Sequence, residues 1–339
     1  MRTPQLLLLS FIVLVSACAS SGKQAGDLPS WVDGQSKQHP KALYLTGVGI
    51  ADNLDDAKDR ARADLAKQFE VAVHEQSQQQ QEYTRQQQGE ASTESLRQSV
   101  TRQLITRTTR TVQGIEIADT WRDDSTHQHY VLAALSRNKA RQQYEQQIHS
   151  LDEQSKQKLK QAEDETDALR KAAQVNDAVE IQLQRMSVQS ALQVVDPTGR
   201  GKPSNLSLGE LIRTRDALIS KVNIEPISHG QLADKLTSVI SGNTANAGFN
   251  IAESAQANYT LLAEAKLDPP LKKEGWTWLR GTLQLTLRDP SNNEIGIKRW
   301  PLKAASVTAD QSQQRLINDI DQILKNELRE AVLGFADVK

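Results

Sequence analysis

Few residues in this chain have the type and spacing that chemistry needs. Cys18 is the only cysteine in 339 residues, so no disulfide can form within the chain. A lone cysteine in an exported protein bonds to another chain, stays a free thiol or is covalently modified. His127 and His129 are two residues apart, which on a strand puts both imidazoles on one face, as a zinc site would need. No third ligand lies near them in sequence, so we favour polar turn residues and predict no metal site.

No other motif indicates catalysis. The sequence contains no H-E-x-x-H, G-x-S-x-G or Walker pattern. Residues 47–49, GVG, could begin a dinucleotide fingerprint, but the third glycine is absent. The helix expected to follow opens with acidic residues, which would repel a pyrophosphate. We therefore expect a protein that is not an enzyme and that has no cofactor.

The residues before Cys18 explain the lone thiol. Leu6 to Val15 is an apolar run interrupted only by Ser10, and Arg2 precedes it. Ten residues cannot span a bilayer, so residues 1–17 are interpreted as a signal peptide. The sequence Val15-Ser16-Ala17-Cys18 resembles the lipobox of bacterial lipoproteins. That resemblance implies cleavage after Ala17 and acylation of Cys18, with palmitate as a typical chain; an ordinary secretory signal is the alternative.

The same resemblance has consequences for localisation. Ala19 rather than aspartate follows the cysteine, which in enterobacterial lipoproteins implies sorting to the outer membrane. Several acyl chains on one residue exceed what stable anchoring requires. Residues 18–28 are small and polar, typical of a flexible tether. We expect a lipid-anchored outer-membrane protein that faces the periplasm.

Charge excludes one class of partner. The net charge is −1, and removal of residues 1–17 takes away Arg2 and no acid, which makes it −2. A nucleic-acid-binding protein needs a marked basic excess, so no nucleic acid is expected. The expected partners are the membrane, through the lipid, and other envelope proteins.

The first folded unit is predicted at residues 29–137. Residues 42–51 indicate a strand, an amphipathic helix starts at Leu54, and residues 114–121 and 129–137 indicate two more strands. The glutamine-rich residues 76–88 are either a solvated helix extension or a disordered loop, and helical spacing returns at Leu96, Val100 and Leu104. Helices on a small antiparallel sheet, an α+β fold, would bury these faces.

This unit resembles a known family. Pro29-Ser30-Trp31, the GxG strand, the helix AKDRARADLAKQFEVAV, GIEIADTW and YVLAALSR occur in the order typical of the LPP-twenty lipoprotein family. The resemblance covers about residues 29–148. The resemblance implies a kind of domain rather than a particular reaction. The family includes FlgP-type outer-membrane lipoproteins associated with the flagellar motor.

Residues 138–195 are predicted to be helical. No glycine or proline occurs between Gly114 and Pro197, and a degraded heptad pattern runs through the segment. One long helix, which could form a coiled-coil homo-oligomer, is one interpretation. An αα-hairpin restarted by Asp164 or Thr166 as the helix cap is the other, and we favour it. Residues 196–205, rich in proline and glycine, are interpreted as a linker that few contacts cross.

The C-terminal unit, residues 206–339, is expected to be a second α+β domain that folds alone. Ser207 and Glu210 have capping-box spacing, and the next helix is expected to stop at Gly242-Asn243. The order α-β-α-β-β-β-α resembles periplasmic domains of the TolB N-terminal, CsgG or LpoB kind, which bind envelope proteins.

Three tryptophans fall on the strands of this unit. One interpretation is that Trp276, Trp278 and Trp300 pack against the last helix. The other is that Trp276 and Trp278, together with Arg280, form a partner-binding patch. Two functions follow from these features. We expect a structural or adaptor lipoprotein of an envelope assembly, flagellar assemblies included. The alternative is a periplasmic regulator of an envelope enzyme such as a peptidoglycan synthase.

Overall fold

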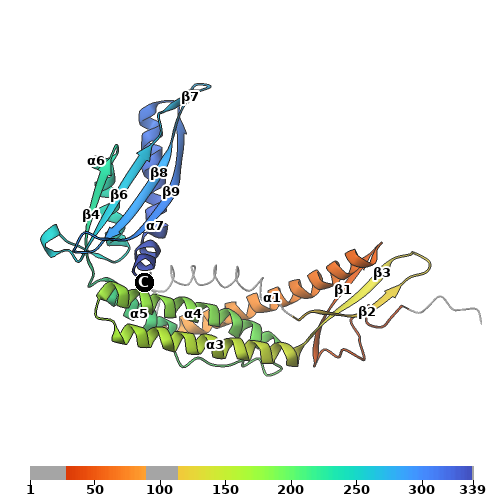
Figure 1. Cartoon of the computed structure of the whole chain (residues 1–339). Coiled ribbons are helices and arrows are strands. Elements are labelled where there is room, and N and C mark those ends of the chain that lie inside the picture. The colour runs from red at the N-terminus through yellow and green to blue at the C-terminus, as the bar shows by residue number, and fades with distance from the viewer. Residues whose placement is uncertain (1–27, 89–113, 338–339) are drawn as a thin grey trace, which may run out of the picture. The chain divides into compact units, whose positions relative to one another are not determined.

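The computed structural model describes residues 28–88 and 114–337 (Figure 1). The fold is α+β, as predicted. Contacts divide the chain into two units, residues 1–65 with 115–135 and residues 66–114 with 136–339. The signal peptide, Cys18, nearly all of the tether and the helical spacing at residues 96–104 lie outside the described residues. In the part of the chain that is described, no helix is long and apolar enough to cross a membrane.

The first unit is a three-stranded sheet with the start of a helix on it. The strands are β1 (Tyr44–Ala51), β2 (Glu116–Arg122) and β3 (His129–Ser136), in the order β1-β3-β2. β2 and β3 are antiparallel, with Trp121 opposite Tyr130. Helix α1 (Leu54–Gln88) begins here, and Ala57, Ala61 and Leu65 are buried. The glutamine-rich residues 76–88 are its extension.

The GVG motif serves packing. A β-carbon on Gly47 would lie 2.5 Å from the Leu65 nitrogen, and one on Gly49 would overlap the backbone of Ala57 and Ala61. Only glycine lets α1 lie this close to β1. The structure therefore accounts for both glycines by the contact between helix and strand.

Helix α1 also covers the backbone of β1, which lies at the edge of the sheet. The Val48 amide donates to Asp64 Oδ2 at 3.0 Å, and Arg60 Nη1 donates to the Ile50 carbonyl at 2.6 Å. Free backbone groups on an edge strand invite pairing with another chain. Arg60 and Asp64, one helical turn apart, form hydrogen bonds with two of these groups.

The second unit contains a helical hairpin. Helix α3 (Arg137–Asp164) and helix α4 (Ala168–Val195) are separate, so residues 138–195 are not one long helix. The cap of α4 is Asp167, whose Oδ1 accepts from the Arg170 amide at 2.9 Å, and not Asp164 or Thr166 as predicted. Asp164 is still the last residue of α3. The residues of α3 that are buried include Tyr144, Ile148, Leu151 and Ala162.

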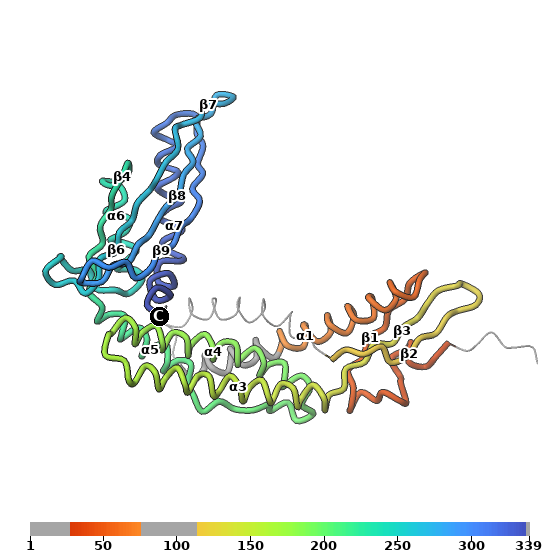
Figure 2. Tube along the Cα trace, in the orientation of Figure 1, coloured from red at the N-terminus to blue at the C-terminus, as the bar shows by residue number. Residues whose placement is uncertain are grey.

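The C-terminal domain consists of a mixed sheet and three helices. Its elements are α5 (Leu208–Ile219), β4 (Asn223–Gly230), α6 (Ala233–Asn246), β5 (Asn250–Ile251), the 3-10 turn η1 (Ser254–Gln256), β6 (Tyr259–Leu267), β7 (Leu271–Lys273), β8 (Trp276–Arg288), β9 (Glu294–Ser306) and α7 (Ala309–Asp337). The sheet order is β5-β4-β6-β8-β7, and β9 pairs with β8. Helices α6 and α7 pack on the sheet, and α7 runs along β8 and β9 (Figure 2).

Helix boundaries in this domain follow side-chain bonds. Ser207 caps α5 as predicted, because its hydroxyl accepts from the Glu210 amide. Helix α6 continues past Gly242-Asn243 to Asn246, which corrects the predicted stop. Asn243 donates to Asp321 of α7 at 2.7 Å, and Thr244 bonds to the Ile240 carbonyl. Contact with α7 thus stabilises the helix beyond the residue where glycine alone would end it.

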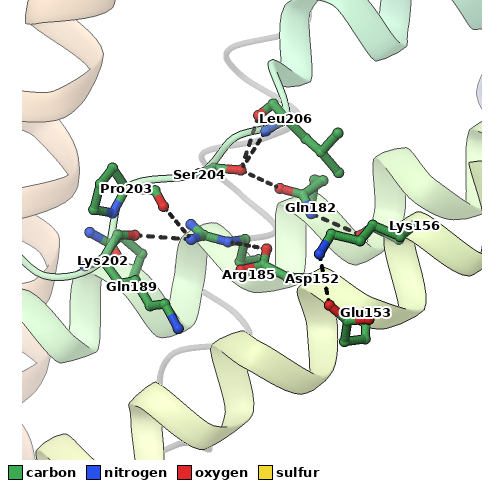
Figure 3. A network of polar contacts seen from close by, with 11 residues as sticks. Asp152, Glu153, Lys156, Gln182, Arg185, Gln189, Lys202, Pro203, Ser204 and Leu206 are labelled. Carbon is green, nitrogen blue, oxygen red and sulfur yellow. Dashed lines mark hydrogen bonds and ion pairs between the residues drawn. The ribbon is translucent and has the colours of Figure 1, made fainter.

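Residues 196–205 are not the contact-poor linker that their composition indicates. Buried Arg185 of α4 donates to the carbonyls of Lys202 and Pro203 at 2.9 and 3.0 Å and pairs with Asp152 of α3 at 2.6 Å (Figure 3). Gln189 accepts from the Lys202 amide at 2.9 Å. We call residues 196–206 the strap, because these bonds hold it along the hairpin.

Candidate partner-binding surface on the C-terminal sheet

Side chains along β8 alternate between the two faces of the sheet, and this alternation determines where Trp276 and Trp278 lie. Thr277 and Leu279 are buried on the face toward α7, together with Leu283, Leu285 and Leu287. Trp276, Trp278 and Arg280 fall between them and lie on the opposite face. Trp276 and Arg280 are exposed, and Trp278 is partly buried. The alternative that these two tryptophans pack against the last helix is therefore wrong.

Trp300 is the tryptophan that packs in the core. It lies on β9 opposite Leu283 and is only 7% exposed. Its indole N–H donates to Glu327 Oε2 of α7 at 2.8 Å, and Lys298 Nζ reaches the same oxygen at 2.7 Å. The Lys298 and Trp300 hydrogen bonds hold the pKa of Glu327 below its ordinary value.

A tight hairpin presents Trp276. β7 and β8 are joined by Glu274 and Gly275, whose φ angles are 52° and 76°. Two left-handed residues in a two-residue loop match the strand twist, and glycine adopts that conformation readily. The register puts Leu271 opposite Trp278, and Leu271 is exposed.

Residues that the sequence did not single out complete the surface. Lys303 of β9 is opposite Arg280, and its Nζ is 5.2 Å from the centre of the Trp278 ring, a cation–π contact. Val307, 66% exposed, follows Ser306, the partner of Thr277. These contacts depend on the β8–β9 register, which cannot be obtained from residue types alone. We call this set the tryptophan surface: Leu271, Trp276, Trp278, Arg280, Lys303 and Val307.

The tryptophan surface is apolar with a positive border. Arg280 and Lys303 belong to it, and Lys272 and Lys273 lie in the adjoining β7. Glu274 is the acid of the turn and pairs with Lys273 at 3.7 Å, both side chains being exposed. Such a surface can bind a partner by burying aromatic rings and pairing charges. It does not combine a nucleophile with a base.

Comparison with known proteins identifies the first part of the chain. Residues 29–136 match the LPP20 lipoprotein family. We call this stretch the LPP20 domain, after the family that it matches. The match covers about a third of the chain and supports a bacterial envelope lipoprotein. No curated protein sequence matches the chain.

Solved structures with similarity to the chain include three bacterial proteins. The secreted protein HP1454 of Helicobacter pylori is 13% identical, with a TM-score of 0.45 over 84% of this chain and 97% of that one. A minor lipoprotein of Acinetobacter baumannii is 15% identical, with a TM-score of 0.27 over 32% and 90%. A lipoprotein of Neisseria meningitidis is 8% identical, with a TM-score of 0.23 over 30% and 97%.

The paired histidines of the LPP20 domain do not share a strand face. His127 lies in the turn between β2 and β3 with a φ of 60°, and His129 is the first residue of β3. Arg122 Nη2 lies 3.5 Å from His127 Nδ1, and a cation there disfavours a bound metal. Among residues 28–88 and 114–337, no three His, Cys, Asp or Glu side chains are grouped to hold an ion. Hydrogen bonds from Ser125 lower the pKa of Asp123, in the same turn, to about 2.

Proposed function

We propose that this lipoprotein is an adaptor of an outer-membrane assembly, anchored through Cys18 and bound to an envelope protein through the tryptophan surface. The lipobox-like residues and the match of residues 29–136 to a lipoprotein family support the anchor. Cleavage after Ala17 leaves Cys18 as the acylated N-terminus, and the folded part faces the periplasm.

One observation carries the binding role. Trp276 is 43% exposed on the sheet face opposite α7, although a tryptophan can bury a large apolar area. Nine large apolar side chains are exposed in the described residues, and Leu271, Trp276 and Val307 are three of them. Their grouping at one end of the sheet is typical of a site where a partner excludes water.

The proposed role is binding rather than turnover. The polar network around Arg185 joins backbone carbonyls and structural side chains (Figure 3). Two of the carboxylates with lowered pKa, Asp123 and Glu327, are held by neighbours in a turn and in a contact between helix and strand. These groups have structural partners, as expected of an adaptor.

The experiment is site-specific crosslinking in the intact envelope. A photoreactive residue at Lys303, in the full chain, should capture one discrete partner. Trp276→Ala with Trp278→Ala should abolish capture while the melting temperature stays within about 3 °C. The control is Ile251→Ala with Ile297→Ala, two exposed residues of the same sheet, which should leave capture intact. Unchanged capture by the folded tryptophan variant would refute the proposed surface.

The anchor has a separate test. Mass spectrometry of the mature N-terminus should show acylated Cys18, and Cys18→Ser should release the protein from the membrane fraction. An unmodified Cys18, or a mature chain that begins elsewhere, would contradict the anchor without affecting the tryptophan surface.

A further inference from the structure

The segment that follows the tether surrounds a hollow on the LPP20 domain. A surface cavity of about 400 Å³ is lined by Ser30, Gly34, Gln35, Ser36, Lys37 and Lys41. This volume is within the range of small-ligand sites. None of the lining residues takes part in the tryptophan surface or in the contact of α1 with β1.

Backbone bonds define one wall of the hollow. The Gln35 amide donates to the Ser30 carbonyl at 3.1 Å, and the Gly34 amide donates to the Trp31 carbonyl at 3.0 Å. Gly34 has a φ of 76°, which lets the chain reverse after the turn. Trp31 is 6% exposed and fixes this turn to the domain.

A second set of bonds positions the lysine side. Ser36 Oγ accepts from the His39 amide at 3.0 Å, and the Leu43 and Tyr44 amides both donate to the Pro40 carbonyl. The His39 ring packs edge-on against Tyr44, with ring centres 4.9 Å apart. Lys37 and Lys41 therefore extend from a hydrogen-bonded segment, residues 36–44, that leads into β1.

The lining has the chemistry of an anion site. Two lysines, two serine hydroxyls and the side-chain amide of Gln35 can donate hydrogen bonds, and the lining residues include no Asp or Glu. A phosphate group, as a free ion, a monoester or a lipid phosphodiester, presents tetrahedrally arranged acceptor oxygens and at least one negative charge, so both lysines can bond to it at once. We propose that this hollow binds a phosphate group.

The tether suggests where the phosphate comes from. Residues 19–27 separate Cys18 from the described chain, and a random coil of nine residues would extend about 15–18 Å. Phospholipid head groups are then within reach of the hollow, provided that Cys18 is acylated as proposed. A soluble phosphate ester would use the same contacts, and only this choice of source rests on the proposed anchor.

The first test uses inorganic phosphate and the mature chain with Cys18→Ser, which carries no lipid. In an NMR titration with phosphate, the amide signals of residues 30–41 should shift, and the shifts should saturate. The same concentration of chloride should not reproduce them. Lys37→Gln with Lys41→Gln should weaken binding at least about tenfold. Lys67→Gln with Lys221→Gln, which removes two exposed lysines elsewhere, is the matched control and should bind as the parent does.

The second test identifies the source. Vesicles of phosphatidylcholine with phosphatidylglycerol are compared with vesicles of phosphatidylcholine alone. Flotation that depends on Lys37 and Lys41 assigns the hollow to lipid head groups. Saturable phosphate shifts without such flotation assign it to a soluble phosphate ligand. Shifts that are absent, unsaturable or spread over the chain overturn the proposal, whatever the vesicles do, and the double tryptophan variant should behave as the parent in both tests.

Discussion

Tyr259 donates its hydroxyl hydrogen to Oδ2 of Asp167 at 2.7 Å. Asp167 caps α4, so this bond joins the helical hairpin to the first residue of β6. Burial, and then the Asp167 carboxylate, raise the pKa of Tyr259 above its ordinary value. Leu169, Ala172 and Ala173 of α4 continue the contact, because they are buried in the same core as the C-terminal sheet.

This shared core changes the expected folding unit. Residues 206–339 alone would expose apolar surface of α5 that packs on Val179 and Leu183 of α4. We expect residues 137–339, which include both helices of the hairpin, to unfold cooperatively and residues 206–339 to melt at a clearly lower temperature or not to fold. Thermal unfolding followed by circular dichroism compares the two. Equal melting temperatures would show that α4 is dispensable.

Trp300→Ala should destabilise the protein by about 3–5 kcal/mol, as expected when a buried tryptophan is removed. Trp300→Phe keeps much of the ring volume but loses the bond to Glu327, so it should cost less. Trp276→Ala is the matched control and should change the unfolding free energy by no more than about 0.5 kcal/mol. Urea titrations give all three values. A large loss for Trp276→Ala would mean that its ring is structural.

Glu327 should contribute to the pH dependence of stability. Its pKa is lower in the folded chain, chiefly through Lys298 and Trp300. Its contribution is therefore complete above the unfolded pKa, about 4.5, and is lost as the pH falls through the folded pKa. Glu327→Gln should flatten the decline of unfolding free energy below about pH 4.5. The same slope in Glu327→Gln as in the parent would contradict this, and exposed Glu253→Gln is the control.

Two glycines should respond oppositely to alanine. Gly49→Ala should destabilise the LPP20 domain by about 1–3 kcal/mol or more, because the methyl group would overlap the backbone of α1. Gly242→Ala should stabilise by about 0.4–1 kcal/mol, since it lies in α6 with nothing within 4 Å of the added carbon. Differential scanning calorimetry measures both. A neutral Gly49→Ala would show that α1 can move away from β1.

Arg185→Ala should free the strap. The change leaves two carbonyls and Asp152 without their donor and should cost about 2–4 kcal/mol. Trypsin should then cut faster after Arg200, as mass spectrometry of a limited digest would show; Lys202 is followed by Pro203 and is not a trypsin site. Arg213→Ala, which removes an exposed arginine of α5, should leave the cleavage rate unchanged.

The sequence was most informative where one pattern decides one feature. The alternation of Leu283, Leu285 and Leu287 predicted β8, and the spacing of Ser207 and Glu210 predicted the start of α5; both are confirmed. The resemblance to the LPP20 family, predicted for about residues 29–148, is confirmed over residues 29–136. These features depend on neighbours within one element, which a sequence displays directly.

Other features depend on contacts between distant residues. Composition indicated an open linker at residues 196–205, but Arg185, an ordinary helix residue in sequence, holds that segment. The stop of α6 was misplaced because Asp321, far along the chain, bonds to Asn243. The tryptophan surface was found only in part, since Lys303 and Val307 join it through strand register.

The strap also decides how the chain would respond to tension. Its eleven residues, if free, could extend to roughly 36–40 Å before they transmitted a pulling force. Bonded to Arg185 and Gln189, the segment has no such slack. A load on the C-terminal sheet therefore passes to α4 at once, and extension starts only when those hydrogen bonds break.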